Sequence, residues 1–198
     1  MTSSLDVVIP VYNEERDIPK CVESLSQFLT STVPNPWTIT IADNGSTDNT
    51  LEVSRTLSRE YLGVKVVHLD QKGRGRALKK VWLESDVDIL VYMDVDLSTD
   101  LDAFVPLVNA IEQVADIAIG TRLAGGSYTK RSFKREFISR SYNALIKSMF
   151  FTRFSDAQCG FKAIRRSSAR VLLPHIVDTQ WFFDTELLII AEKQNFCV

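Results

Sequence analysis

Short apolar runs that alternate with helix-like segments constrain the fold of this chain more than any other feature. Runs rich in β-branched residues predict strands at 5–11, 37–42, 64–69, 88–93 and 116–120, and helix-like segments lie between them at 15–29, 48–61, 75–84 and 100–114. Strand, helix and strand in this order form βαβ units, whose strands pair in parallel. The runs are apolar throughout, as strands covered on both faces require. The sequence therefore predicts a single α/β domain with a mostly parallel central sheet flanked by helices.

The alternation stops after residue 120. A Gly/Ser loop at 123–127 leads into a basic, aromatic helix expected at 132–150, and a loop at 156–160 precedes helical segments at 167–173 and 183–194. No internal repeat or linker divides the chain, so we expect one domain spanning residues 1–198. Residues 195–198 resemble the opening of another strand, so we expect the chain to be C-terminally truncated or part of a longer, membrane-associated protein.

Charge and cysteine content narrow the range of partners. The chain has 23 Lys and Arg residues against 25 Asp and Glu, a net charge of −2, which provides no basic field for nucleic acid. Three widely spaced cysteines form no disulfide framework and indicate a reducing compartment. No apolar run reaches the roughly 18 residues that span a bilayer. We therefore expect no nucleic-acid partner and a cytoplasmic location.

Polar residues follow the first two predicted strands, where open α/β sheets bind their ligands. The first strand leads into Pro10, Tyr12 and Glu14, and the second ends at Asp43, before an Asn-Gly turn. The chain has neither the GxGxxG nor the GxxxxGK[ST] motif, which argues against ordinary dinucleotide and P-loop sites. Asp43 could accept hydrogen bonds from a base or a ribose, although a polar turn followed by a helix cap explains most of the same residues.

The third strand leads into a glycine-rich helix start, residues 72–78. Backbone N–H groups at such a start, Gly73 among them, can face an anion, and Lys72, Arg74 and Arg76 add positive charge. A simple helix start with solvated cations is the alternative.

Two carboxylates, Asp94 and Asp96, follow the fourth strand. In extended backbone, residues two apart share a face, and carboxylates that close repel one another unless a cation lies between them. Oxygen-only ligation suits Mg²⁺ or Mn²⁺. We therefore expect a divalent ion and a diphosphate here, and we expect His68 and His175 to be structural.

Six segments in this order resemble family-2 glycosyltransferases of the Rossmann-like GT-A fold, in particular the dolichyl- or polyprenyl-phosphate glucose and mannose synthases. They are VVIPVYNEE (7–15), DNGSTD (43–48), KGRGRAL (72–78), MDVDLST (93–99), IGTR (119–122) and DAQCGFKA (156–163). The chain departs modestly from the family pattern at Arg74, Arg76, Val95 and Cys159, and none of these changes removes a charged ligand.

The resemblance implies an inverting, metal-dependent transfer of a hexose from UDP-glucose or GDP-mannose to a polyprenyl or dolichyl phosphate at the cytoplasmic face of a membrane. Its site residues map onto Pro10, Tyr12, Glu14, Asp43, Lys72, Gly73, Arg74 and Asp94 for the nucleotide, Asp94 and Asp96 for the metal, and Arg122, Arg135, Cys159 and Gly160 for the acceptor. Arginine side chains suit an acceptor phosphate because guanidinium groups bind phosphate bidentately.

Two other functions stay open. A sugar-hydroxyl acceptor would need a carboxylate to take its proton, and Asp184 or Glu186 are the candidates, although helix capping explains both. An inactive nucleotide-binding module of a longer membrane protein is the other alternative.

The segment 130–153 places cations and apolar side chains at helical spacing, as in helices that lie on anionic lipid. The alternative is a helix packed on the sheet, with a solvated basic side. We expect contact with a membrane surface.

That expectation predicts salt-sensitive binding to anionic liposomes. Each cation near an anionic surface contributes about 1 kcal/mol, and salt screens the attraction. The chain should co-sediment with such liposomes at low salt and be released at about 0.5 M NaCl, where the screening length is about 4 Å. Replacing Arg131, Lys134 and Arg140 with Gln should weaken sedimentation and preserve nucleotide binding. If the wild-type chain does not co-sediment with these liposomes at low salt, the helix has only a structural role in the fold.

Overall fold

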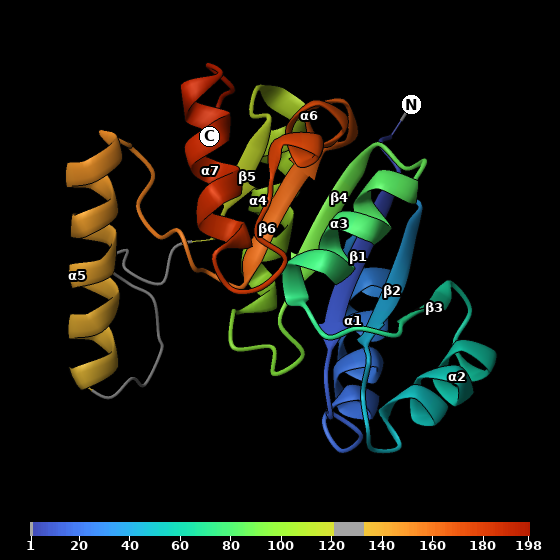
Figure 1. Cartoon of the computed structure of the whole chain (residues 1–198). Coiled ribbons are helices and arrows are strands. Elements are labelled where there is room, and N and C mark those ends of the chain that lie inside the picture. The colour runs from blue at the N-terminus through green and yellow to red at the C-terminus, as the bar shows by residue number, and fades with distance from the viewer. Residues whose placement is uncertain (1, 121–132) are drawn as a thin grey trace.

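A computed structural model describes residues 2–120 and 133–198, and it has three layers, with a sheet between two sets of helices (Figure 1). The strands are β1 (Leu5–Val11), β2 (Trp37–Asn44), β3 (Val64–Leu69), β4 (Ile89–Met93), β5 (Ile117–Ile119) and β6 (Phe161–Arg165). They form one sheet in the order β3-β2-β1-β4-β6-β5, in which β6 is antiparallel to both neighbours and the other described pairs are parallel. The expected single GT-A-type α/β domain is confirmed.

The helices divide between the two faces of the sheet. They are α1 (Ile18–Thr32), α2 (Thr50–Glu60), α3 (Arg74–Glu84), α4 (Phe104–Gln113), α5 (Phe133–Phe150), α6 (Arg166–Leu172) and α7 (Phe183–Lys193). The buried side chains of α1, α2 and α4 share one core cluster, and those of α3, α5, α6 and α7 share the other. Short 3-10 turns precede α4 and follow α6, at Leu101–Ala103 and Leu173–His175.

The first strand shows why an unbroken apolar run fits this architecture. Val7, Ile9 and Val11 belong to the core cluster on one face of the sheet, whereas Val8 belongs to the cluster on the other. Successive side chains of a strand point to opposite faces, so a sheet covered on both sides needs apolar residues at every position. This packing fixes the carboxyl ends of the parallel strands at one edge, where the polar loops begin.

The sixth strand corrects the sequence-based expectation of a loop followed directly by a helix. Strand β6 lies between β4 and β5, with Phe161 opposite Met93 and Lys162 opposite Tyr92. The strand was missed because a lysine interrupts its short apolar run. Lys162 is nevertheless fully buried.

The end of the chain adds to the sheet edge beyond β5. The backbone carbonyl of Cys197 accepts hydrogen bonds from the N–H groups of Asp116 and Ile117, at 2.9 and 3.1 Å. Residues 195–198 are not themselves a strand, and the expected continuation of the chain stays a prediction. None of the helices in the described part of the chain has the length and apolarity needed to cross a membrane.

Candidate active site

A cavity of about 520 Å³ opens where the carboxyl ends of β1, β2 and β4 meet the start of α3. It gathers most of the predicted nucleotide and metal residues, together with a segment that precedes α7. The lining residues are Pro10, Val11, Tyr12, Glu14, Asp17, Asn44, Lys72, Arg74, Asp94, Val95, Asp96, Gln180 and Trp181.

Hydrogen bonds between two loops hold Tyr12 and Glu14 at this cavity. Asn13 has a left-handed backbone with φ 58°, and its side-chain oxygen accepts a hydrogen bond from the N–H of Thr47 at 2.8 Å. The N–H of Glu14 donates to the Thr50 hydroxyl at 2.7 Å. Hydrogen bonds of short polar side chains therefore fix the loop after β1 to the loop after β2.

Asp94 and Asp96 both line the cavity, but not through the extended backbone expected from their spacing. The chain turns instead: the N–H of Leu97 donates to the Asp94 carbonyl at 3.2 Å, and Leu97 has a φ of 46°. One carboxylate oxygen of Asp96 accepts a hydrogen bond from the N–H of Ser98 at 3.0 Å. The turn brings both carboxylates to the same cavity because it begins where β4 ends.

Negative charge accumulates on this side of the cavity. Burial raises the pKa of Asp94, although the nearby Arg74 guanidinium opposes the rise. Burial also raises the pKa of Glu14, and Asp17 and Asp96 raise it further. Burial disfavours the charged form of a carboxyl group, and a bound cation would offset that cost. The oxygen donors of Asp94 and Asp96 therefore fit Mg²⁺ or Mn²⁺, with the remaining positions open to water and phosphate oxygens.

Positive charge on the other side comes from side chains. The Lys72 ammonium lies 3.5 Å from the centre of the Tyr12 ring, and a guanidinium nitrogen of Arg74 lies 3.8 Å from an Asp94 oxygen. The N–H of Gly73 donates to the Asn44 side chain at 2.6 Å, and the N–H of Arg76 donates to a carbonyl at 3.1 Å. These two N–H groups therefore donate within the protein, and whether the glycine-rich segment faces an anion stays a prediction.

Asp43 lies beside the cavity rather than on its surface. Its side chain is fully buried, and one carboxylate oxygen lies 2.6 Å from Nδ1 of His68. The other oxygen has no hydrogen-bond partner among the described residues. A contact between Asp43 and a nucleotide base stays a prediction.

Gly160 lies directly against the carboxylate of Asp94. Its carbonyl accepts a hydrogen bond from the N–H of Asp94 at 3.1 Å, and a Cβ atom at position 160 would lie only 1.6 Å from Asp94 Oδ2. The neighbouring Cys159 is fully buried, and its carbonyl accepts a hydrogen bond from Lys162. Whether either residue contacts an acceptor stays a prediction.

The two candidate bases are engaged with the protein. Asp184 is fully buried, and its carboxylate contacts Arg74 and lies 2.9 Å from the Lys162 ammonium. Glu186 accepts hydrogen bonds from the N–H groups of Val177 and Asp178, the latter at 2.8 Å. These contacts indicate that Asp184 and Glu186 stabilise the start of α7.

Sequence reasoning missed the segment that closes the cavity in front of α7. Gln180 donates to the Lys72 carbonyl at 3.2 Å, and the Arg74 guanidinium carbon lies 4.7 Å from the centre of the Trp181 ring. Trp181 is nevertheless 68% exposed. The only sequence signal is an aromatic cluster ahead of a helix, which is also typical of core packing.

Two arginines are predicted to bind the acceptor phosphate. Arg122 and the side chain of Arg135 lie outside the described residues. Their roles stay predictions.

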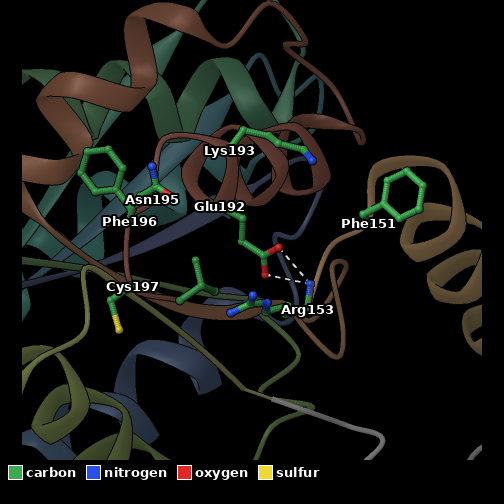
Figure 2. A pocket seen from close by; sticks show the side chains of 8 residues that line it. Phe151, Arg153, Glu192, Lys193, Asn195, Phe196 and Cys197 are labelled. Carbon is green, nitrogen blue, oxygen red and sulfur yellow. Dashed lines mark hydrogen bonds between the residues drawn. The ribbon is translucent and has the colours of Figure 1, made fainter.

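A second cavity, of about 420 Å³, lies near the C-terminal residues (Figure 2). The Glu192 carboxylate there accepts hydrogen bonds from the N–H groups of Arg153 and Phe154. Cys197 also lines this cavity, and it forms hydrogen bonds with residues at the start of β5. The second cavity therefore lies at the opposite end of the strands from Asp94 and Asn44. We assign no chemistry to this cavity.

Comparison with known proteins identifies the family of the chain. The profile described as "Glycosyl transferase family 2" matches residues 6–173. The chain belongs to this family. It is 34% identical over 197 residues to "Glycosyltransferase AglD" of Haloferax volcanii, which covers 98% of this chain and 32% of that protein. It is 30% identical over 204 residues to "Dolichyl-phosphate beta-glucosyltransferase" of Drosophila melanogaster, covering 96% of this chain and 63% of that protein.

The chain thus spans about a third of the first relative and less than two thirds of the second. Solved structures share the fold. Glucosyl-3-phosphoglycerate synthase from Mycobacterium tuberculosis, in complex with Mn²⁺, UDP and glucosyl-3-phosphoglycerate, has a TM-score of 0.70 and 22% identity and covers 97% of this chain and 66% of that chain. The mannosyltransferase PcManGT from Pyrobaculum calidifontis, in complex with GDP-Man and Mn²⁺, has a TM-score of 0.59 and 19% identity over 87% of this chain and 47% of that chain.

The contact between Gly160 and Asp94 predicts that Gly160→Ala impairs the acidic site. The added methyl group would displace the Asp94 carboxylate, and a misplacement of about 1 Å can cost roughly 100-fold in rate. We expect that loss in glycosyl transfer, measured alongside the thermal unfolding midpoint as a control for folding. In the Asp94→Asn background, Gly160→Ala should cost much less, because the two changes affect one group. Equal losses in both backgrounds would contradict this account.

Proposed function

We propose that this chain is the catalytic part of an inverting glycosyltransferase that moves a hexose from a nucleotide sugar to a polyprenyl phosphate. The observation that carries the proposal is the cavity in which Asp94 and Asp96 face Lys72 and Arg74. Paired carboxylates could hold a divalent ion, and the neighbouring cations could bind a diphosphate. Membership of glycosyl transferase family 2 supports the same chemistry.

The reaction breaks the bond between the anomeric carbon and the diphosphate and forms a bond from that carbon to the acceptor oxygen. A divalent ion bound by Asp94 and Asp96 would neutralise charge on the departing diphosphate as a Lewis acid. Lys72 and Arg74 add positive charge on the same leaving group, and the loop that carries Tyr12 and Glu14 orients the nucleotide. A single displacement inverts the anomeric centre.

A phosphate acceptor is supported by the relatives and by the contacts of the carboxylates. A phosphate is already anionic near neutral pH, so it needs cationic groups to align it rather than a base, and we assign this role to Arg122 and Arg135. The candidate bases Asp184 and Glu186 already contact protein groups. The names of the relatives, dolichyl-phosphate beta-glucosyltransferases, favour UDP-glucose as the donor over GDP-mannose.

A polyprenyl acceptor also requires access to a membrane surface. Three large apolar side chains at the end of α5 face solvent, with Leu145, Met149 and Phe151 exposed by 54%, 60% and 84%. The same helix is held to the domain by buried Ile146 and by a hydrogen bond of 2.8 Å between the Tyr142 and Thr185 hydroxyls. We infer that the exposed side of α5 contributes to contact with lipid.

Radiolabelled donors and a short polyprenyl phosphate test the proposal directly. Incubation of the chain with UDP-glucose or GDP-mannose and a divalent ion should give an organic-extractable labelled lipid with one of the donors. Label recovered only in oligosaccharide would replace the lipid acceptor with a sugar hydroxyl. Tight nucleotide binding without turnover would indicate an inactive binding module.

Loss of one acidic ligand should raise the metal requirement. Asp94→Asn or Asp96→Asn removes a charge from the proposed ion site, so we expect the Mn²⁺ concentration for half-maximal activity to rise at least roughly tenfold. Circular dichroism should show an unchanged fold. The matched control is Asp102→Asn, which makes the same charge change at an exposed residue of the following 3-10 turn. Full activity of EDTA-treated wild type would exclude a metal role for the pair.

A further inference from the structure

Lys162 is an unusual residue in the interior of this fold. It is the second residue of β6, opposite Tyr92 of β4 and Ile119 of β5, and its side chain is fully buried. Burial lowers the pKa of Lys162 to about 7. A buried ammonium is retained only where acceptors surround it. Because its side chain has no access to solvent, Lys162 cannot touch a substrate in the cavity.

Lys162 instead contacts a second buried charge. Its ammonium lies 2.9 Å from a carboxylate oxygen of Asp184, in the first turn of α7, and donates to the Cys159 carbonyl. The other oxygen of Asp184 contacts the guanidinium of Arg74. Asp184 therefore lies between a buried lysine and an arginine that lines the cavity.

Close packing of two helix starts fixes this arrangement. Gly75 of α3 lies against Phe183 of α7, and a Cβ at Gly75 would lie 2.6 Å from the Phe183 Cβ. Arg74 and Asp184 are the chain neighbours of these two residues, so the contact of the helices brings the two charges together. A cation at a helix start is opposed by the helix dipole, whereas a carboxylate there is favoured, so Asp184 offsets the unfavourable position of Arg74.

Arg74 has one further anionic neighbour, Asp94, whose nearest oxygen is 3.8 Å from the guanidinium. Without Asp184, Arg74 would move onto Asp94 and compete for the carboxylate that the proposed function assigns to the divalent ion. With Asp184 in place, the guanidinium is held between the two carboxylates and beside the Tyr92 and Trp181 rings, whose centres lie 5.2 and 4.7 Å from its central carbon. From the interior to the cavity, the charged side chains therefore alternate in sign, in the order Lys162, Asp184, Arg74 and Asp94.

We infer that Lys162 and Asp184 are positioning residues that act through Arg74: Asp184 holds this cation away from Asp94, and Lys162 shares the charge of Asp184, so that Arg74 stays available for the nucleotide diphosphate. The inference rests on the proposed function, because it assigns Arg74 to the diphosphate. It gives Asp184 a role different from that of a base, since both of its carboxylate oxygens face cations.

A double-mutant cycle on nucleotide binding tests this inference. The affinities of wild type, Lys162→Met, Arg74→Met and the double variant for UDP and GDP are measured by titration calorimetry with Mn²⁺. We expect Lys162→Met alone to weaken binding by roughly 3- to 30-fold, which lies within the range found for coupled neighbours. In the Arg74→Met background it should have no further effect, because the residue through which it acts is gone. Equal losses in both backgrounds, or no loss in either, would overturn the inference.

Lys65→Met is the matched control. Lys65 also pairs with a fully buried carboxylate, Asp6, at 3.0 Å, but it lies near the start of β3, at the far end of the strands from the cavity. Lys65→Met should leave the affinities for UDP and GDP unchanged. A loss equal to that of Lys162→Met would show that removing the cationic partner of any buried carboxylate weakens binding, and would overturn the positioning role.

Two further measurements keep the result interpretable. If circular dichroism shows that Lys162→Met does not fold, Asp184→Asn takes its place in the same cycle, because it keeps the size of the side chain and removes the charge. If wild type binds neither UDP nor GDP, the proposed function fails, and the cycle is repeated on the free energy of unfolding in urea. Non-additive effects of Lys162→Met and Arg74→Met would then support the network, and additive effects would overturn it.

Discussion

Hydrogen-bonded pairing of β6 with β4 holds the candidate site together. In that register Phe161 lies opposite Met93, so the residues at the adjoining strand ends, Gly160 and Asp94, meet. The N–H of Asp94 donates to the Gly160 carbonyl, and the absence of a side chain at position 160 leaves room for the Asp94 carboxylate. The same strand carries Lys162 beneath the cavity. A parallel strand in this place would reverse that order and would not bring Gly160 to the end of β4.

Charge balance explains why the site contains both acidic and basic side chains rather than side chains of one charge. An uncompensated carboxylate such as Asp94 is costly in a partly buried place, and its raised pKa reflects that cost. Arg74 lowers the cost, yet a guanidinium that paired fully with Asp94 would leave nothing for an ion or a phosphate. Shared contact with Asp184 resolves this conflict, because it gives Arg74 a second carboxylate in the protein interior.

The sequence predicts the parallel part of the fold and the position of the acidic pair, because both depend on local patterns. Five of the strands follow from apolar runs, and Asp94 and Asp96 from their place after β4. The turn at Leu97 could not be predicted, because a leucine rarely adopts a left-handed backbone. Lys162 and Trp181 were missed for a different reason. A buried lysine and an exposed tryptophan reverse the usual preferences of these residues, and their contacts join segments far apart in sequence.

The distribution of carboxylates also bears on the nature of the acceptor. A hydroxyl nucleophile needs a carboxylate with an oxygen free to take a proton. Among the described residues near Arg74 and Trp181, Asp184 faces two cations, and Glu186 accepts hydrogen bonds from two backbone N–H groups. Asp94 and Asp96 are the oxygen donors that suit the metal. The acceptor that we propose, an ionised phosphate, needs none of these groups as a base.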